Sequence, residues 1–292
     1  MKKNPLFYLW AALLFTSCDV KDPIYNTPHP EHGKITLTAD WSARGAGIDI
    51  PATYTVQAGD YSATLSDATA TLDHLFAPGT YHTYIYSTPE HITVSGTTAT
   101  VGTASGTWDG VGAFVHAAPG WLFTCATDAV IEKDTEHALT AAMQQQVRQL
   151  TLIVEPTGGT TGRIEAIEGY LSGVASTFDM NGGTHGTPAN VALTFTKLTD
   201  GADAGKWSAT VRLLGTAGSA QQLTAEIRFS GNNPRPVTLT SDLTTELAAF
   251  NTDKTKPLTL GGKVVETPTE AGFTATITDW EQVTGDGPVY AD

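Results

Sequence analysis

Residues 34–41 read KITLTADW, in which apolar and polar side chains alternate at every step. In an extended chain, successive side chains point to opposite faces. One face of this segment would therefore carry Ile35, Leu37, Ala39 and Trp41, while the polar residues between them would face the solvent. A strict period of two is typical of a half-buried β-strand.

The same alternation recurs along most of the chain. It is found in ATYTVQ (52–57), TYHTYIYS (80–87), ITVSG (92–96), QLTLIVEP (149–156), VALTFTKL (191–198), KWSATVRLLG (206–215), QLTAEIRFSG (222–231) and GFTATITDWEQV (272–283). Clusters rich in Gly, Pro and Asn separate these segments, as in DMNGGTHGTP (179–188). Many short strands punctuated by turn residues predict an all-β protein made of antiparallel β-sandwiches.

The length allows two such sandwiches, since 292 residues can build two ordinary cores. The polar stretch AAMQQQ (141–146) is the best boundary, which predicts an N-terminal sandwich at 34–145 and a C-terminal sandwich at 146–288. At most one or two short helices are expected. SDLTTELAAFN (241–251) favours a helix with Ser241 as its N-cap. DTEHALTAAMQQQVRQ (134–149) fits either a helix or an irregular connector.

The first residues have the layout of an export signal. Residues 1–17 combine a basic start, an apolar run of about ten residues and small residues at the end, which predicts a secretory signal peptide. Leu14 to Cys18, LFTSC, resembles the lipobox of bacterial lipoproteins, which implies cleavage before Cys18 and a lipid on its thiol. Residues 18–33 would form an extended tether. The alternative is a secreted protein in which Cys18 pairs with Cys125, which otherwise is a small core residue.

The sequence contains little that indicates catalysis or a cofactor. The formal net charge is −14, and no Lys/Arg cluster follows Lys34, so nucleic acid is not an expected partner. HPEH (29–32) lacks further metal ligands, and DMNGG (179–183) is only a fragment of a calcium loop. Asp279 and Glu281 form a lone acid pair. We therefore expect no metal site, no cofactor and no enzyme. Tyr81, Tyr84 and Tyr86 fit either a carbohydrate platform or cross-strand packing.

Several longer segments together resemble one family of surface proteins. They are HPEHGKITLTADW (29–41), RQLTLIVEP (148–156), IEAIEGYLSGVASTFD (164–179) and LTLGGKVVETPTEAGFTATITDWEQV (258–283). These segments resemble the fimbrillin-like lipoproteins of Bacteroidales, especially the FimB-type fimbrial anchor group. The resemblance implies two transthyretin-like β-sandwich domains, a lipid anchor in the outer membrane and a place at the base of type V fimbriae. It also implies fimbrial subunits as partners, joined by exchange of a β-strand.

The resemblance also draws attention to Arg44, in the loop SARGAGIDIP (42–51). Stalk subunits of that family lose their first strand to an arginine-specific protease, so Arg44 is the possible processing site. Cleavage there would separate the body from Cys18, so an anchor subunit would keep Arg44 intact. The last strand, 273–283, is a second candidate for exchange. The alternative function is a non-polymerising surface lipoprotein that binds a glycan or a host ligand.

Overall fold

The computed structural model describes residues 29–105, 108, 110–232, 234–269 and 272–283. The predicted signal peptide, Cys18 and residues 19–28 of the predicted tether lie outside the described residues. Residues 29–32 form a turn, and Gly33 already begins the first strand. Within the described part of the chain, no helix is long and apolar enough to cross a membrane.

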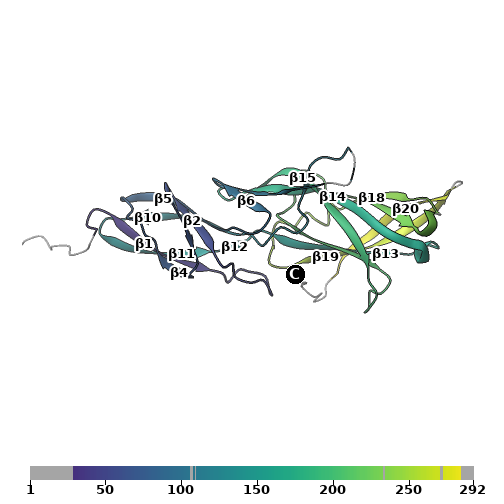
Figure 1. Ribbon diagram of the computed structural model, residues 1–292, viewed down its shortest axis with the longest axis horizontal. Helices are drawn as coiled ribbons and strands as arrows, with labels where there is room; N and C mark the ends of the chain where they lie inside the picture. Colours follow the sequence, from purple (N-terminus) through teal and green to yellow (C-terminus); the bar gives the residue numbers. More distant parts are fainter. Residues whose placement is uncertain (1–28, 106–107, 109, 233, 270–271, 284–292) are drawn as a thin grey trace, which may run out of the picture.

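Strands joined by turns make up nearly all of the fold (Figure 1). The strands of the first half are β1 Gly33–Asp40, β2 Tyr54–Ala58, β3 Tyr61–Leu65, β4 Thr69–Thr71, β5 Gly79–Ser87, β6 Ile92–Ser95, β7 Thr98–Val101, β8 Thr103–Ala104, β9 Phe114–Val115, β10 Phe123–Ile131, β11 Thr135–Ala142 and β12 Gln144–Gln145. Those of the second half are β13 Arg148–Pro156, β14 Ile164–Asp179, β15 Thr184–Lys197, β16 Trp207–Leu213, β17 Gln222–Phe229, β18 Val237–Asp242, β19 Leu258–Thr269 and β20 Gly272–Gln282. Two single 3-10 turns, Thr161–Arg163 and Ser230–Asn232, complete the elements.

The strands form two groups that lie end to end along the long axis of the molecule (Figure 1). The first group has a sheet of order β11-β1-β4 and a sheet of order β12-β10-β5-β2-β3. The second group follows the path β18-β17-β14-β15-β16-β13-β19-β20. Most neighbours are antiparallel, which confirms the predicted all-β, antiparallel sandwich class. Parallel pairs are β1 with β11, β13 with β19 and β9 with β15.

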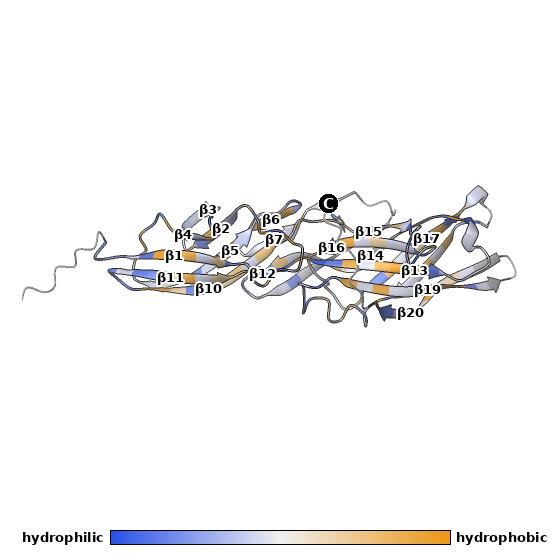
Figure 2. Ribbon diagram, turned by 90° about the horizontal axis from the view of Figure 1, so that it is seen from below, coloured by the Kyte–Doolittle hydropathy of each residue, from blue (hydrophilic) through white to orange (hydrophobic). Residues whose placement is uncertain are grey.

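Each group encloses an apolar core. The first core contains the inward face of β1 together with side chains such as Val56, Ile85 and Phe123. The second core is larger and includes Leu150, Leu171 and Leu193 on the long strands. Hydrophobic residues, drawn in orange, occur along strands of both groups, such as β1 and β13 (Figure 2). Burial of these faces supplies the main driving force for folding, at about 25 cal/mol for each Å² of apolar surface removed from water.

Strand pairing crosses the predicted boundary near residue 145. Residues 92–115 belong to the first half of the chain, but β7 pairs with β14 and β9 pairs with β15. Their side chains Ile92, Ala99 and Val101 lie in the second core. The second group of strands therefore includes a segment, 92–115, from the first half of the chain. The bounds 34–145 and 146–288, and the number of domains, remain a prediction.

Both alternatives predicted for residues 134–149, a helix or an irregular connector, are wrong, because this segment contains strands β11 and β12 and the start of β13. β11 runs parallel to β1 from Gly33 opposite Thr135 to Asp40 opposite Ala142. Ala141 and Met143 point inwards and are fully buried. Pairing with β1 satisfies the backbone groups that a helix would have satisfied internally.

The helix predicted at 241–251 is replaced by consecutive turns. The three apolar residues expected to face the core, Leu243, Leu247 and Phe250, are nevertheless all buried. Ser241 is the last but one residue of β18, and its hydroxyl accepts a hydrogen bond from Trp280 Nε1 (2.8 Å) instead of capping a helix. A segment this short gains little from helix formation alone, so packing decides its conformation.

Candidate functional site

Strand β1 is the central strand of its sheet and is held on both sides. It pairs in parallel with β11 along its whole length and antiparallel with β4 through Leu37, which lies opposite Ala70. The side chains of Ile35 and Leu37 have no solvent exposure. Removal of β1 would leave an apolar groove between two unpaired strand edges, which is the template that another strand needs.

The loop that follows β1 places Arg44 at the surface and the next residue in the interior. The Arg44 guanidinium bends back onto its own loop, where Nε donates to the Ile48 carbonyl (3.1 Å) and Nη1 to the Trp41 carbonyl (3.1 Å). Gly45 is buried, and its backbone N–H donates to Oε1 of Gln145 (2.8 Å). A Cβ atom on Gly45 would approach the Thr255 carbonyl oxygen to 2.6 Å. The Arg44–Gly45 peptide bond is thus fixed in a folded loop.

Gln145 connects three parts of the chain. Its side-chain nitrogen donates to the carbonyls of Val147 (2.8 Å) and Lys254 (2.6 Å), while its oxygen accepts from Gly45. The residue is 5% exposed, so each of these hydrogen bonds is sheltered from water. Losing a buried partner costs roughly 1–3 kcal/mol, since the remaining group stays unpaired. Gln145 therefore ties the loop after β1 to the loop between β18 and β19.

We expect trypsin to leave the Arg44–Gly45 bond of the folded protein intact and to cleave it faster after Gln145→Ala. If cleavage proceeds through local opening, a loss of roughly 1–3 kcal/mol raises the rate about fivefold to a hundredfold. Limited proteolysis with mass spectrometry of the fragments measures this rate. Gln144→Ala is the matched control, because that neighbouring side chain is exposed and should leave the rate unchanged. Rapid cleavage of the unaltered protein at Arg44 would contradict this expectation.

A second polar group, next to Gln145, is centred on Lys254. Its Nζ donates to Oε1 of Gln146 (2.7 Å) and contacts Nε2 of His185 (2.9 Å), and it lies 4.9 Å from the centre of the Phe178 ring. Burial lowers the pKa of Lys254 to about 7. Burial, and then the nearby Lys254 charge, lowers the pKa of His185 to about 4. At neutral pH, His185 is thus uncharged and Lys254 is divided between its two protonation states.

The C-terminal strand β20 lies at the end of the strand path, beyond β19. The register with β19 shifts at Gly262, where Asp279 adopts a positive φ of 56°. This bulge leaves Trp280 packed against the second core, with its Nε1 bonded to Ser241. A Cβ atom on Gly262 would lie 2.9 Å from the Trp280 ring, so only glycine fits there. Strand β20 is thus held by the side chain of Trp280 as well as by its backbone hydrogen bonds to β19.

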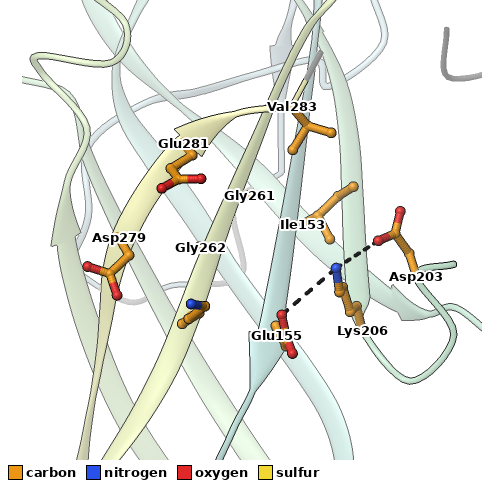
Figure 3. Close-up of a pocket in the computed structure, with 10 residues that line it drawn as sticks. Ile153, Glu155, Asp203, Lys206, Gly261, Gly262, Asp279, Glu281 and Val283 are labelled. Carbon is orange, nitrogen blue, oxygen red and sulfur yellow. Dashed lines mark hydrogen bonds and ion pairs between the residues drawn. The ribbon is translucent and has the colours of Figure 1, made fainter. Parts of the chain in front are cut away.

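A cavity of about 190 Å³ lies beside this edge, between β13, β19 and the end of β20 (Figure 3). Lys206 forms ion pairs with Asp203 (2.8 Å) and Glu155 (3.8 Å) on one side of it. Asp279 and Glu281 lie on the other side, beyond Gly261 and Gly262 (Figure 3). The predicted acid pair thus lines a shallow cavity, and among the described residues no cluster of three metal-binding side chains exists.

The other residues considered in the sequence have structural partners. His29 is buried and its Nδ1 contacts the His32 carbonyl (3.1 Å), within the turn that precedes β1. The Asp179 carboxylate accepts from the backbone N–H of Gly182 (2.8 Å), which closes a turn. Tyr86 is buried, and Tyr81 packs edge-on against Phe76 at 5.2 Å. Tyr84 is half-buried, and its hydroxyl donates to Oδ1 of Asn181 (2.9 Å), so each of the three tyrosines is buried or has a contact within the fold.

Cys125 is a half-buried side chain against the first core and forms no disulfide within the described residues. Burial raises the pKa of its thiol, which keeps it protonated and unreactive near neutral pH. The lipidation site Cys18 lies outside the described residues. The Gln145 and Lys254 contacts were missed in the sequence, because glutamines in a polar run and a lysine in NTDKTKP (251–257) give no periodic signal.

Together, these features define an antiparallel β-sandwich protein whose first strand is embedded in a core. The chain belongs to the family of fimbrillin-A associated anchor proteins Mfa1 and Mfa2, whose sequence profile matches residues 45–286. This match confirms the resemblance to fimbrial anchor proteins. No curated protein matches the sequence.

Solved structures with the same fold come from Bacteroides and Porphyromonas species. A candidate adhesin from Bacteroides ovatus ATCC 8483 has 16% identity and a TM-score of 0.61, covering 91% of this chain and 98% of its own. A second candidate adhesin from Bacteroides ovatus has 11% identity and a TM-score of 0.59, covering 87% and 96%. The fimbrial anchor protein Mfa2 from Porphyromonas gingivalis has 11% identity and a TM-score of 0.53, covering 84% and 95%. At such identities the likeness establishes the fold.

Proposed function

We propose that the protein is a lipid-anchored fimbrial subunit of the outer membrane that acts as an anchor or accessory protein at the base of a pilus. Membership of the anchor family is the observation that carries this proposal. The role is structural, and no catalytic step is assigned to the protein. Fimbrial subunits are the proposed partners, and the cell surface is the proposed location.

Lipid on Cys18 would hold the protein in the membrane, and β1 would be the first folded element to bear the load. Fourteen residues, 19–32, separate Cys18 from β1. Tension from the membrane would reach β1 at Gly33, where the strand pairs with β11 and is linked to Phe76. Because β1 is hydrogen-bonded on both sides, it resists extraction better than an edge strand would. A firmly held first strand suits an anchor.

An uncleaved bond after Arg44 fits the same anchor role. An anchor must keep the covalent link between Cys18 and the body, and this link passes through the Arg44–Gly45 bond. The buried Gly45 and its hydrogen bond to Gln145 support the proposal that this bond stays intact. With β1 retained, its groove stays filled, so we propose that strand exchange with the next subunit takes place at the other end of the chain. The candidate is β20, which pairs with β19 on one side only, and its donation would require the bond between Trp280 and Ser241 to break.

Deletion of the gene tests the proposal. Without an anchor, assembled pili should appear in the medium instead of on the cells, which electron microscopy and immunoblots of both fractions measure. The gene supplied on a plasmid should restore attachment. Pili of unchanged length and attachment would overturn the proposal and favour a non-polymerising surface lipoprotein that binds a glycan or a host ligand.

A further inference from the structure

A cavity of about 460 Å³ opens where the two strand groups meet, and we call it the junction cavity. Its lining comes from β12, β14, β15 and the β18–β19 loop, and the side chains used below are Gln146, Phe178, His185, Asp253 and Lys254. The volume is in the range of small-molecule binding sites. Polar groups from separate strands converge in it, although nothing in the proposed anchor role requires them.

Lys254 is the central charged group of this cavity. Its side chain belongs to a residue that is only 9% exposed, and its two close polar partners, Gln146 and His185, are neutral. Because an ammonium group has three N–H donors, one N–H has no polar acceptor among the described residues, and the Phe178 ring, whose centre is 4.9 Å from Nζ, is a weaker contact that an anion could replace. His185 cannot offer a hydrogen-bond donor to a ligand, because its ring already contacts Lys254 and hydrogen-bonds to the Leu214 backbone. The donor that remains for a ligand in the cavity is therefore the third N–H of Lys254.

The charge on Lys254 is not balanced by any neighbouring carboxylate. Asp253 is turned towards Thr255 (2.8 Å) and Lys256 (3.4 Å), and Lys254 has no ion pair among the described residues. Arg148, a further cation that packs against this loop from β13, donates to the Phe250 and Lys256 carbonyls. A buried cation without a counter-charge is costly, and an anion bound from solution would remove that cost.

We propose that the junction cavity binds a small carboxylate, which accepts a hydrogen bond from the free donor of Lys254. A single cation beside a neutral imidazole matches a monoanion. The Asp253 carboxylate at the rim disfavours a dianion such as phosphate. The side chains of Gln144, Thr252 and Thr255 line the same cavity and provide polar groups for the rest of the ligand. This site is independent of lipid anchoring and of pilus attachment.

Isothermal titration at pH 7 and constant ionic strength tests the site, with sodium acetate and sodium glucuronate as ligands and sodium chloride as the salt control. Saturable binding of a carboxylate is expected. Lys254→Met should weaken it at least tenfold, whereas Lys256→Met should bind as the unaltered protein does, because that lysine is exposed. Stronger binding of glucuronate than acetate would identify a sugar acid. Equal binding would show that the carboxylate alone is recognised.

A pH series on the unaltered protein provides a second test that does not depend on any variant. The ligand prefers the protonated lysine, whose pKa in the free protein is about 7. Affinity should thus fall about tenfold for each pH unit above 7, with uptake of most of one proton at pH 8, measured in buffers of different ionisation enthalpy. Sodium phosphate is titrated as a third ligand. Three outcomes would overturn the proposal: no saturable binding of a carboxylate, equal binding by Lys254→Met, or stronger binding of phosphate than of either carboxylate.

Discussion

Replacing Cys18 by serine should move the protein from the membrane fraction to the soluble fraction and abolish its labelling by radioactive palmitate. Each buried methylene contributes roughly 0.8 kcal/mol to membrane binding, and a single acyl chain anchors only marginally. A cysteine that carries two or three chains should hold the protein almost permanently, so the loss of attachment should be nearly complete. Fractionation of cells followed by immunoblotting measures the change, and mass spectrometry of the mature N-terminus identifies the attached group.

Cys125→Ser is the matched control for this experiment. Its thiol is half-buried against the first core and remains protonated, so the substitution should leave membrane attachment unchanged. A Cys18→Ser protein that stays in the membrane fraction would refute the lipid anchor. Release by Cys125→Ser as well would point to a disulfide between the two residues instead.

The alternating segments predicted the fold class correctly because solvent and core impose the same period on every half-buried strand. In β1, the sequence alone separates the buried residues Ile35, Leu37 and Ala39 from their polar neighbours. The same reasoning located the strands near 149–156 and 206–215. Such patterns are local, so they predict which face of a strand is buried without any knowledge of the strands that pair with it.

Residues 134–149 show where this reasoning fails. Leu139, Met143 and Val147 have helical spacing, but His137, Leu139, Ala141 and Met143 also alternate as in a strand. Alanine occurs at positions of both kinds and does not separate the two patterns. The choice is made by β1, which offers a complete edge for β11 to pair with. A partner a hundred residues away in the chain leaves no trace in the local pattern.

Long-range contacts also explain why the candidate sites were only partly predicted. Arg44 was recognised from a resemblance, but the next residue, Gly45, is held by Gln145, which is a hundred positions further on. Lys254 and His185 come together from a loop and a distant strand. Single histidines and lysines are usually surface residues, so a site built from them emerges only when the strands are in place.

The position of β1 links the lipid anchor to the stability of the whole first core. Its inward face belongs to the same apolar cluster as Tyr54, Ile85 and Phe123, on the opposite sheet. Any change that loosens this strand would open the groove and release the loop that carries Arg44. Anchoring, resistance to proteolysis and folding of the first core should therefore be lost together.

Leu37→Asp should accordingly prevent stable folding of the first core. Leu37 is completely buried, and removing such a side chain costs about 2–5 kcal/mol. An unpaired carboxylate in its place adds a desolvation penalty of several kcal/mol. The sum is comparable to the entire stability of a typical domain, about 5–15 kcal/mol. Urea unfolding followed by near-ultraviolet circular dichroism should show a missing or greatly lowered transition, and trypsin should then cleave at Arg44.

Thr38→Asp is the matched control, because it introduces the same charge one position along β1 but on the opposite face of the strand. Comparing the two variants separates the effect of burial from the effect of the charge itself. Thr38 lies on the outer side of β1, where its hydroxyl forms a 3.0 Å hydrogen bond with that of Thr69. Losing this exposed contact should cost less than about 1 kcal/mol, because the new carboxylate stays hydrated. A difference of several kcal/mol between two adjacent substitutions follows only if β1 is a buried central strand. Equal effects at the two positions would mean that the strand is not held in the core, and the anchor proposal would lose the strand that is meant to resist tension from the membrane.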